Sequence, residues 1–300
     1  MKTLIKFNRS FEPAYGTLAR VTPLVRRLVA HNPSAFTAWG TGTYVVGRNA
    51  VAVIDPGPDD AGHIDRLLSE LGDERVAQIV VTHTHIDHSP GARILQARTG
   101  APIVGCGPHA RAGTHDEPVE EGGDFEHQPD RLLQDGDAVT GAGWTLTAVH
   151  TPGHTSNHLC YALAEEQALF SGDHVMGWST TVVSPPDGDM TRYIASLEKL
   201  LARDDRVLYP THGAPVTQPK PFIEQLIAHR REREEQILSI LKSGPALIPA
   251  IVAELYAEVD PKLHRAAGRS VLAHLIGLID SGRVRCDGVP DAASPYRLPG

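Results

Sequence analysis

The feature that most constrains this chain is a cluster of three histidines and an aspartate that directly follows an apolar run at residues 76–81. The run has the composition of a buried strand. The cluster reads H-x-H-x-D-H and contains His83, His85, Asp87 and His88. Imidazole and carboxylate groups both bind zinc and related metals. Because alternate side chains of an extended segment point the same way, His83 and His85 can chelate one ion. Asp87 and His88, beyond the turn, can reach a second ion.

Three further candidate ligands, His154, Asp173 and His212, each follow a short apolar run and lie beside a glycine in a turn. A histidine-rich surface loop would explain residues 83–88 alone, but it does not explain these partners. Loops at one edge of a sheet sandwich can converge, and binding residues tend to lie on such loops. We therefore expect two metal sites with a shared carboxylate: His83, His85 and His154 in one, Asp87, His88 and His212 in the other, and Asp173 bridging both.

Such a ligand set predicts hydrolytic chemistry. Two metals roughly 3.5–4 Å apart hold a bridging hydroxide, which is a nucleophile at neutral pH, and polarise a carbonyl or phosphoryl oxygen. Asp87 is the candidate catalytic residue, because it can handle protons as well as bind metal. Ligands that are all nitrogen or oxygen favour zinc but permit manganese or iron. The expected cofactors are therefore two Zn²⁺ ions per chain.

Length, charge and cysteine content limit the remaining classes. The 300 residues suffice for one large domain and a small one, each with its own core. The formal net charge of -8 argues mildly against a nucleic-acid partner, which usually meets a basic face. Cys106, Cys160 and Cys286 are far apart, which is typical of reduced thiols in a cytoplasmic protein. The sequence has no run of about 18 apolar residues, so we expect no membrane span.

Apolar runs, turns and helical patterns alternate along the chain, which favours a layered α/β fold. Helices are expected where apolar residues recur at helical spacing, at 59–72, 90–98 and 191–201. Strands are expected at 21–30, 43–46, 51–54, 76–81, 102–104, 137–149, 159–164, 168–170 and 207–209. Asp55 follows one of these strands, and it either caps a turn or orients a metal-bound histidine.

The segment 106–130 is rich in Gly, His, Asp and Glu and shows little periodicity. It predicts a long loop, and loops of that length are usually functional or mobile. Its histidines, His109, His115 and His127, are interpreted as solvated loop residues. We expect the substrate pocket to take its walls from this loop and from a second loop at 179–189.

The last part of the chain predicts a separate module. A long helix is expected at 221–242, and the mixed charges at 229–235 are interpreted as a mostly solvated face. Two helices at 246–256 and 262–280 and a short strand pair suggest a winged-helix-like domain. From residue 244 onward six Lys and Arg balance six Asp and Glu, which disfavours duplex DNA and favours packing or a homodimer. The predicted domains are 1–220 and 221–300.

These motifs resemble the metallo-β-lactamase fold superfamily. H-x-H-x-D-H, Thr-Pro-Gly-His-Thr at 151–155, Gly-Asp at 172–173 and the histidine before Gly213 follow the family's order. The resemblance implies an αββα sandwich with a dinuclear site at one edge, and it makes Asp55 a support of that site. The long helix with its charged stretch at 229–235 and the winged tail narrow the resemblance to the β-lactamase-like protein 2 group, close to glyoxalase II hydrolases.

The resemblance leaves two substrate classes open. Relatives in this group include thioesterases that act on acyl carrier proteins and single-strand-specific endoribonucleases. Ester or thioester hydrolysis is the leading prediction, because the chain is acidic and its tail is neutral. Single-stranded RNA is the alternative, with Arg230, Arg231 and Arg233 as its best cations. Hydrolysis of β-lactams or lactones, or a non-catalytic module, is less favoured. Thr84 stands where the group often has a bulky aromatic residue, which alters the pocket wall.

Overall fold

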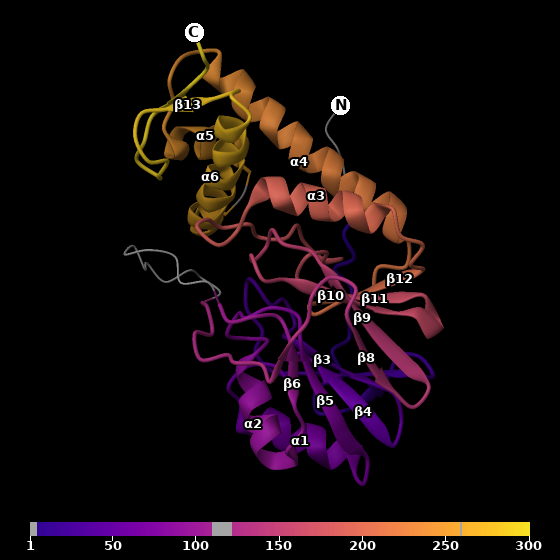
Figure 1. Ribbon diagram of the computed structural model, residues 1–300. Helices are drawn as coiled ribbons and strands as arrows, with labels where there is room; N and C mark the ends of the chain where they lie inside the picture. Colours follow the sequence, from indigo (N-terminus) through magenta and orange to yellow (C-terminus); the bar gives the residue numbers. More distant parts are fainter. Residues whose placement is uncertain (1–4, 110–121, 259) are drawn as a thin grey trace.

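The computed structural model describes residues 5–109, 122–258 and 260–300. Two β-sheets face one another in the centre, with helices on both outer sides (Figure 1). The first sheet has the order β1-β2-β3-β4-β5-β6-β7 and the second the order β12-β11-β10-β9-β8. This arrangement is the predicted αββα sandwich.

The first sheet begins as an antiparallel meander and continues with parallel strands. Its strands are β1 (Ala19–Arg20), β2 (Val25–Val29), β3 (Gly42–Val46), β4 (Ala50–Ile54), β5 (Arg75–Val81), β6 (Ile103–Gly105) and β7 (Arg131–Leu132). Helix α1 (Ala61–Leu71) joins β4 to β5, and α2 (Pro90–Thr99) joins β5 to β6. Asp60 begins α1 by accepting from two backbone N–H groups, and Gly72 ends the helix, as its sequence predicts.

The second sheet contains β8 (Ala138–Gly141), β9 (Trp144–His150), β10 (Leu159–Leu163), β11 (Ala168–Gly172) and β12 (Val207–Pro210). A short 3-10 turn (Ala164–Glu166) joins β10 to β11, and α3 (Met190–Leu201) joins β11 to the parallel strand β12. Strands β9 and β11 are both antiparallel to β10, so they run in the same direction. The carboxyl ends of β9, β11 and β12 therefore lie at one edge of this sheet.

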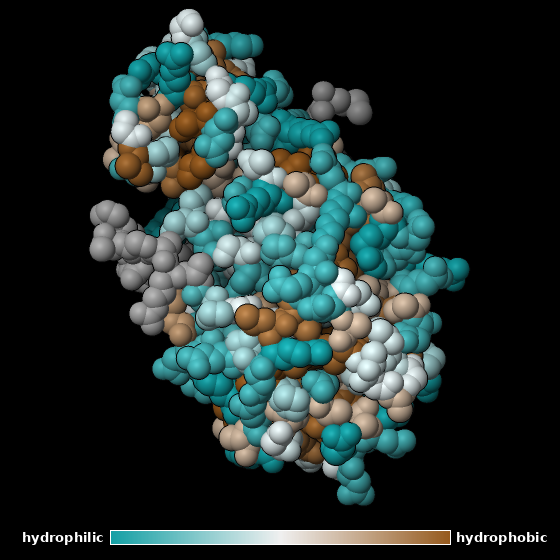
Figure 2. All heavy atoms as spheres, in the orientation of Figure 1, coloured by the Kyte–Doolittle hydropathy of each residue, from teal (hydrophilic) through white to brown (hydrophobic). Residues whose placement is uncertain are grey.

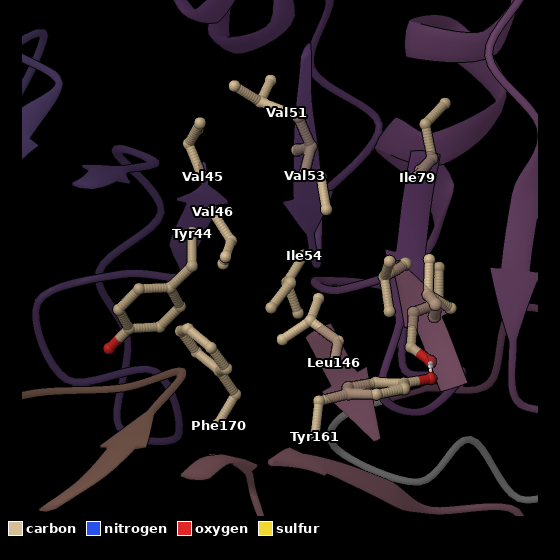
Figure 3. Packing of buried hydrophobic residues seen from close by; sticks show 14 of the residues in the cluster. Tyr44, Val45, Val46, Val51, Val53, Ile54, Ile79, Leu146, Tyr161 and Phe170 are labelled. Carbon is tan, nitrogen blue, oxygen red and sulfur yellow. Dashed lines mark hydrogen bonds between the residues drawn. The ribbon is translucent and has the colours of Figure 1, made fainter. Parts of the chain in front are cut away.

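The main core lies between the two sheets (Figure 3). Tyr44 packs edge-on against Phe170 of the opposite sheet, with ring centroids 5.1 Å apart. Tyr161 donates a hydrogen bond to the carbonyl oxygen of Val81, at 2.7 Å. Neighbouring residues of β10, such as Cys160, point to the other face and contribute to a second core under α3 and α4. The period-two alternation of β10 thus serves both layers.

The C-terminal part has a core of its own. It contains α5 (Ile248–Leu255), a 3-10 turn (Pro261–Leu263), α6 (His264–Asp280), and the antiparallel pair β13 (Arg285–Cys286) and β14 (Tyr296–Arg297). Helix α4 (Pro219–Leu241) leads into it. The first turns of α4 supply Phe222 and Leu226 to the core under α3, whereas its last turns supply Ile237 and Leu241 to the C-terminal core. One helix therefore belongs to both cores.

The molecular surface fits this layered arrangement. The face drawn in Figure 2 is mostly hydrophilic, and hydrophobic residues show on it as small separate patches. Within the part of the chain that the structure describes, no helix is both long enough and apolar enough to cross a membrane.

Candidate metal centre

The residues that follow β4, β5, β9, β11 and β12 meet at one edge of the sandwich. Parallel strands bring their carboxyl ends to the same edge, so loops that are distant in sequence converge there. Three groups of side chains each have ligand atoms within 4.8 Å of one another: His83, His85 and His154; His83, His88 and Asp173; and Asp87, His88 and His212. The structure thus brings together all seven residues that the sequence singled out.

The first group consists of three imidazoles. Nε2 of His83 lies 3.0 Å from Nδ1 of His85, and that Nδ1 lies 3.1 Å from Nε2 of His154. Nitrogen ligands about 2.0–2.1 Å from a tetrahedral zinc ion would be about 3.4 Å apart. The observed spacings are slightly shorter than this edge. The three nitrogens therefore need only a small expansion to surround one ion.

The second group combines two imidazoles with a carboxylate. Oδ2 of Asp87 lies 3.3 Å from Nε2 of His88 and 3.2 Å from Nε2 of His212. Asp173 stands between the groups. Its Oδ2 is 3.3 Å from Nε2 of His212, 3.6 Å from Nε2 of His88 and 3.9 Å from Nε2 of His154. The Asp173 carboxylate therefore lies within 4 Å of an imidazole nitrogen from each group.

Asp55 fixes the orientation of the second group. It follows β4 with a left-handed φ of 48°, and its Oδ2 lies 3.0 Å from Nδ1 of His88. The backbone N–H and the hydroxyl of Thr82 also donate to this carboxylate, at 2.8 and 2.7 Å, and the Thr211 hydroxyl donates at 3.2 Å. Of the two roles considered for Asp55, the contacts support the orienting one.

Other partners orient the remaining imidazoles. The carbonyl oxygen of Val182 lies 2.7 Å from Nδ1 of His154, and that of Gly40 lies 3.1 Å from Nδ1 of His212. Because a carbonyl only accepts, each Nδ1 carries a proton, and each Nε2 faces the site, where it would bind a cation once it carries no proton. Such outer hydrogen bonds usually accompany metal-bound histidines. Thr41 donates in the same way to Oδ2 of Asp87, at 3.0 Å.

The electrostatics of the two groups differ. Burial lowers the pKa of His83 and of His85 well below the usual range, so both are neutral and ready to bind a cation. Burial also opposes charge on His212, but Asp173 and Asp87 outweigh it and raise its pKa to about 10. The same two carboxylates raise the pKa of His88 well above its usual value. Protons on these imidazoles balance the carboxylates, which is the role that a divalent cation would take.

Two buried atoms test whether a metal fits here. Nε2 of His88 and Oδ1 of Asp173 have no hydrogen-bond partner among the described residues. Buried polar groups are rarely left unpaired without a reason. Both atoms belong to the predicted ligands, and the surrounding donor set of nitrogen and oxygen suits zinc, manganese or iron. A divalent cation therefore fits the arrangement.

His158 was missed by the sequence prediction. It is fully buried, and its ring lies 5.1 Å from that of His83 at an angle of 30°. Its Nε2 accepts from the backbone N–H of Asp173 at 3.3 Å, and its Nδ1 lies 2.9 Å from the Thr151 hydroxyl. A β-carbon at Gly172 would lie 2.6 Å from this ring, so only glycine fits there. The only available signal was a histidine beside a predicted strand.

The loop histidines have different environments. The prediction of a solvated side chain is wrong for His127, which is fully buried and has Nε2 3.3 Å from the carbonyl oxygen of Cys106. His109 is partly buried, with Nδ1 2.9 Å from the hydroxyl of Thr84. Asn157 donates to the same hydroxyl at 2.8 Å, so Thr84 links His109 to Asn157. His115 lies outside the described residues.

Comparison with known proteins now places the chain. The model for the metallo-beta-lactamase superfamily matches residues 38–212, which hold the whole ligand set. The chain belongs to the metallo-beta-lactamase superfamily. A second model, for the beta-lactamase associated winged helix domain, matches residues 248–290. The predicted fold, including its winged C-terminal module, is confirmed by these two matches.

Among relatives in this superfamily, an atrochrysone carboxyl ACP thioesterase of Aspergillus chevalieri is 33% identical over 239 residues, covering 77% of this chain and 70% of that protein. A beta-lactamase-like protein 2 homolog of Drosophila melanogaster is 32% identical over 279 residues, covering 89% and 92%. A solved beta-lactamase domain protein of Burkholderia ambifaria shares the fold with a TM-score of 0.79 at 22% identity, covering 98% of this chain and 97% of that one.

Proposed function

We propose that this chain is a hydrolase that binds two divalent ions, zinc by preference, and cleaves a thioester or ester with water. The observation that supports it most directly is the position of Asp173 between a group of three imidazoles and a group formed by Asp87, His88 and His212. When bound, a pair of such ions supplies an activated water and an electrophile for the substrate carbonyl.

The protein side chains then have separate roles in the proposed reaction. His83, His85 and His154 would hold one ion, His88 and His212 would hold the other with Asp87, and Asp173 would be shared between them. Asp87 is the more accessible carboxylate, with 15% of its side chain exposed against 6% for Asp173. We assign proton handling to Asp87. Water adds its oxygen to the carbonyl carbon, the carbon–sulfur or carbon–oxygen bond breaks, and the proton passes to the leaving group.

The thioester preference has two supports. The relative from Aspergillus chevalieri is named as a thioesterase that acts on an acyl carrier protein. Two of the three arginines considered for RNA are also engaged within the protein, because Arg230 is only 4% exposed and Arg233 lies over the ring of Tyr256 at 4.4 Å. Of the three arginines considered for RNA, Arg231 is the one with a largely exposed side chain.

An assay panel tests this proposal. The zinc-loaded chain is incubated with acyl thioesters of increasing chain length, with thiol release followed by a colorimetric reagent, and separately with labelled single-stranded RNA. We expect thioester turnover that a chelator abolishes and zinc restores, with the RNA intact. RNA cleavage without thioester turnover would replace the proposal with the nuclease alternative. Metal analysis of the purified protein should give two zinc ions per chain, and two iron ions would point to redox chemistry instead.

We further propose residues 1–220 as the catalytic unit and 221–300 as an accessory unit, in a cytoplasmic protein. The separate C-terminal core supports the division, although the first turns of α4 pack on the catalytic side. Unpaired cysteines at 106, 160 and 286 support a reducing compartment. We also propose that the accessory unit forms a homodimer and that the protein does not bind duplex DNA. Sedimentation analysis would test the dimer, and a salt titration with duplex DNA would test the lack of binding.

A further inference from the structure

Arg230 lies in the middle of α4 and is only 4% exposed. The interpretation of this charged stretch as a solvated face is therefore wrong for Arg230. The next residue, Arg231, behaves as predicted, with 62% of its side chain exposed and an ion pair to Glu198. Burying a guanidinium is costly unless its donors are used. A buried arginine at this point of the helix thus calls for a specific partner.

The partner is a backbone carbonyl in the segment that follows β11. Nη2 of Arg230 donates to the carbonyl oxygen of Thr181, at 2.5 Å. The guanidinium also lies over the ring of Tyr193 from α3, 5.1 Å from its centroid. The hydroxyl of Tyr193 in turn donates to the carbonyl oxygen of His174, at 3.1 Å. Arg230 therefore holds residues 174–181 both directly and through α3.

The segment held in this way contacts two predicted ligands. The hydroxyl of Thr181 donates to the carbonyl oxygen of Asp173 at 2.8 Å and to that of His174 at 3.1 Å. The carbonyl oxygen of the next residue, Val182, receives the Nδ1 proton of His154 at 2.7 Å. If Thr181 and Val182 shifted, the backbone of Asp173 would lose the Thr181 hydroxyl, and the imidazole of His154 would lose the Val182 carbonyl. Both predicted ligands thus depend on where Thr181 lies.

The turn before His154 is also tightly packed, so it cannot move to compensate for a shift of Val182. A β-carbon at Gly153 would lie 2.3 Å from Cα of Tyr193, so the turn before His154 packs directly on α3. The backbone N–H of Asp189 also donates to the carbonyl oxygen of Gly153, at 2.8 Å. The turn is thus fixed from one side by α3, and the imidazole is fixed from the other side by Val182.

We propose that Arg230 is a positioning residue for the metal centre. From the helix that both cores share, it fixes the segment at 181–182 and thereby the tautomer and direction of His154 and the place of Asp173. The inference rests on the proposed metal site, because it assigns a role to Arg230 only through two of its ligands. It also gives α4 a function in the catalytic unit besides carrying the winged module.

The test compares Arg230→Met with Arg231→Met, the same substitution one residue away at an exposed position. Zinc affinity of the metal-free full-length chains is measured by competition with a chromophoric chelator, and kcat and KM are measured on the best thioester. We expect Arg230→Met to weaken binding of at least one ion by up to roughly tenfold, the lower end of the range for losing an outer hydrogen bond to a metal ligand, because Arg230 acts on the ligands through Thr181. Its kcat should fall more than its KM changes. Arg230→Lys, which keeps a cationic donor, should restore part of the affinity, and Arg231→Met should match the wild type.

A second variant, Thr181→Val, tests the same inference if Arg230→Met does not fold. Thr181→Val keeps the size of the side chain and the carbonyl that Arg230 holds, but removes the hydroxyl bonds to Asp173 and His174. It should also weaken zinc binding. If Arg230→Met folds and binds zinc like Arg231→Met, or if Thr181→Val binds like the wild type when Arg230→Met does not fold, the inference is overturned. A wild-type chain that binds no divalent ion would instead overturn the proposed function itself.

Discussion

Oδ2 of Asp55 lies 3.0 Å from Nδ1 of His88, although 33 residues separate them. The contact joins the end of β4 to the turn after β5, two neighbouring parallel strands. His88 is fully buried and Asp55 is 1% exposed. The carboxylate therefore keeps a proton on Nδ1 of His88 and directs Nε2 toward Asp87 and Asp173.

The Asp55→Asn variant tests this relationship. The described side chains and the Thr82 N–H that contact the Asp55 carboxylate all donate to it, so an amide NH₂ in its place would face another donor and allow His88 to change tautomer. We expect zinc affinity to fall roughly ten- to a hundredfold. Zinc competition measures the effect, and Asp59→Asn, at an exposed aspartate on the same loop, is the control. Equal zinc affinity in the two variants would contradict the assigned role.

Asp173→Asn tests the bridging carboxylate. The amide keeps the side-chain size but removes the charge that two ions would share, so we expect metal content to fall from two ions to one. The loss in kcat/KM should exceed the roughly hundredfold upper range for removing an outer hydrogen bond. Elemental analysis and thioester kinetics measure both effects, and Asp204→Asn, an exposed partner of Lys220, is the control. Retention of two ions and full activity would exclude a bridging role.

We expect His63 to make the metal-free protein less stable as the pH falls below 6.5. It is 7% exposed on α1, with Nε2 2.9 Å from the Thr43 hydroxyl, and burial lowers its pKa to about 4. The unfolded chain takes up this proton near pH 6.5, whereas the folded chain resists it until about pH 4. The stability contributed by neutral His63 is therefore complete above pH 6.5 and is lost as the pH falls toward 4.

The matching variant is His63→Gln, which keeps a polar side chain but does not titrate. Between pH 7 and 4.5, the free energy of unfolding should fall by roughly 2–3 kcal/mol more in the wild type than in this variant. Urea unfolding with a chelator present measures the difference. His150→Gln, at an exposed histidine, should follow the wild type. Parallel curves for the wild type and His63→Gln would refute the assignment.

Tyr161→Phe separates stability from metal binding. The lost hydroxyl ties the second sheet to the carbonyl of Val81 at the end of β5, inside the core shown in Figure 3. We expect the free energy of unfolding to fall by about 1–2 kcal/mol, because the buried carbonyl oxygen of Val81 loses the Tyr161 hydroxyl and keeps the longer bond, at 3.4 Å, from the Cys106 N–H. Zinc affinity should stay within about twofold, because the hydrogen bond of this hydroxyl goes to the carbonyl oxygen of Val81 and not to a predicted ligand. Tyr15→Phe, at a 40% exposed tyrosine, is the control, and a large loss of zinc affinity in Tyr161→Phe would be unexpected.

Much of the fold was predictable because its signals are local. Asp60 and Gly72 mark the ends of α1, and the alternation in β10 assigns each residue to a face. The helix expected at 221–242 runs from Pro219 to Leu241, so its ends differ by only one or two residues. Helix caps, helix-ending glycines and apolar periodicity each depend on residues that are close together in the chain, so they can be recognised from the sequence alone.

The candidate ligands were also visible, since each lies directly after an apolar run and parallel strands must place such ends together. The chain by itself thus determined the sandwich, the winged module and the seven residues at its edge. Only the tertiary structure decided that His158 supports Asp173, that His127 is buried and that Arg230 reaches Thr181. The physical reason is that burial and hydrogen-bond partners depend on contacts between separate elements. Arg230 and Thr181 are 49 residues apart, and Asp55 and Thr211 are 156 residues apart, so no local pattern records either pair.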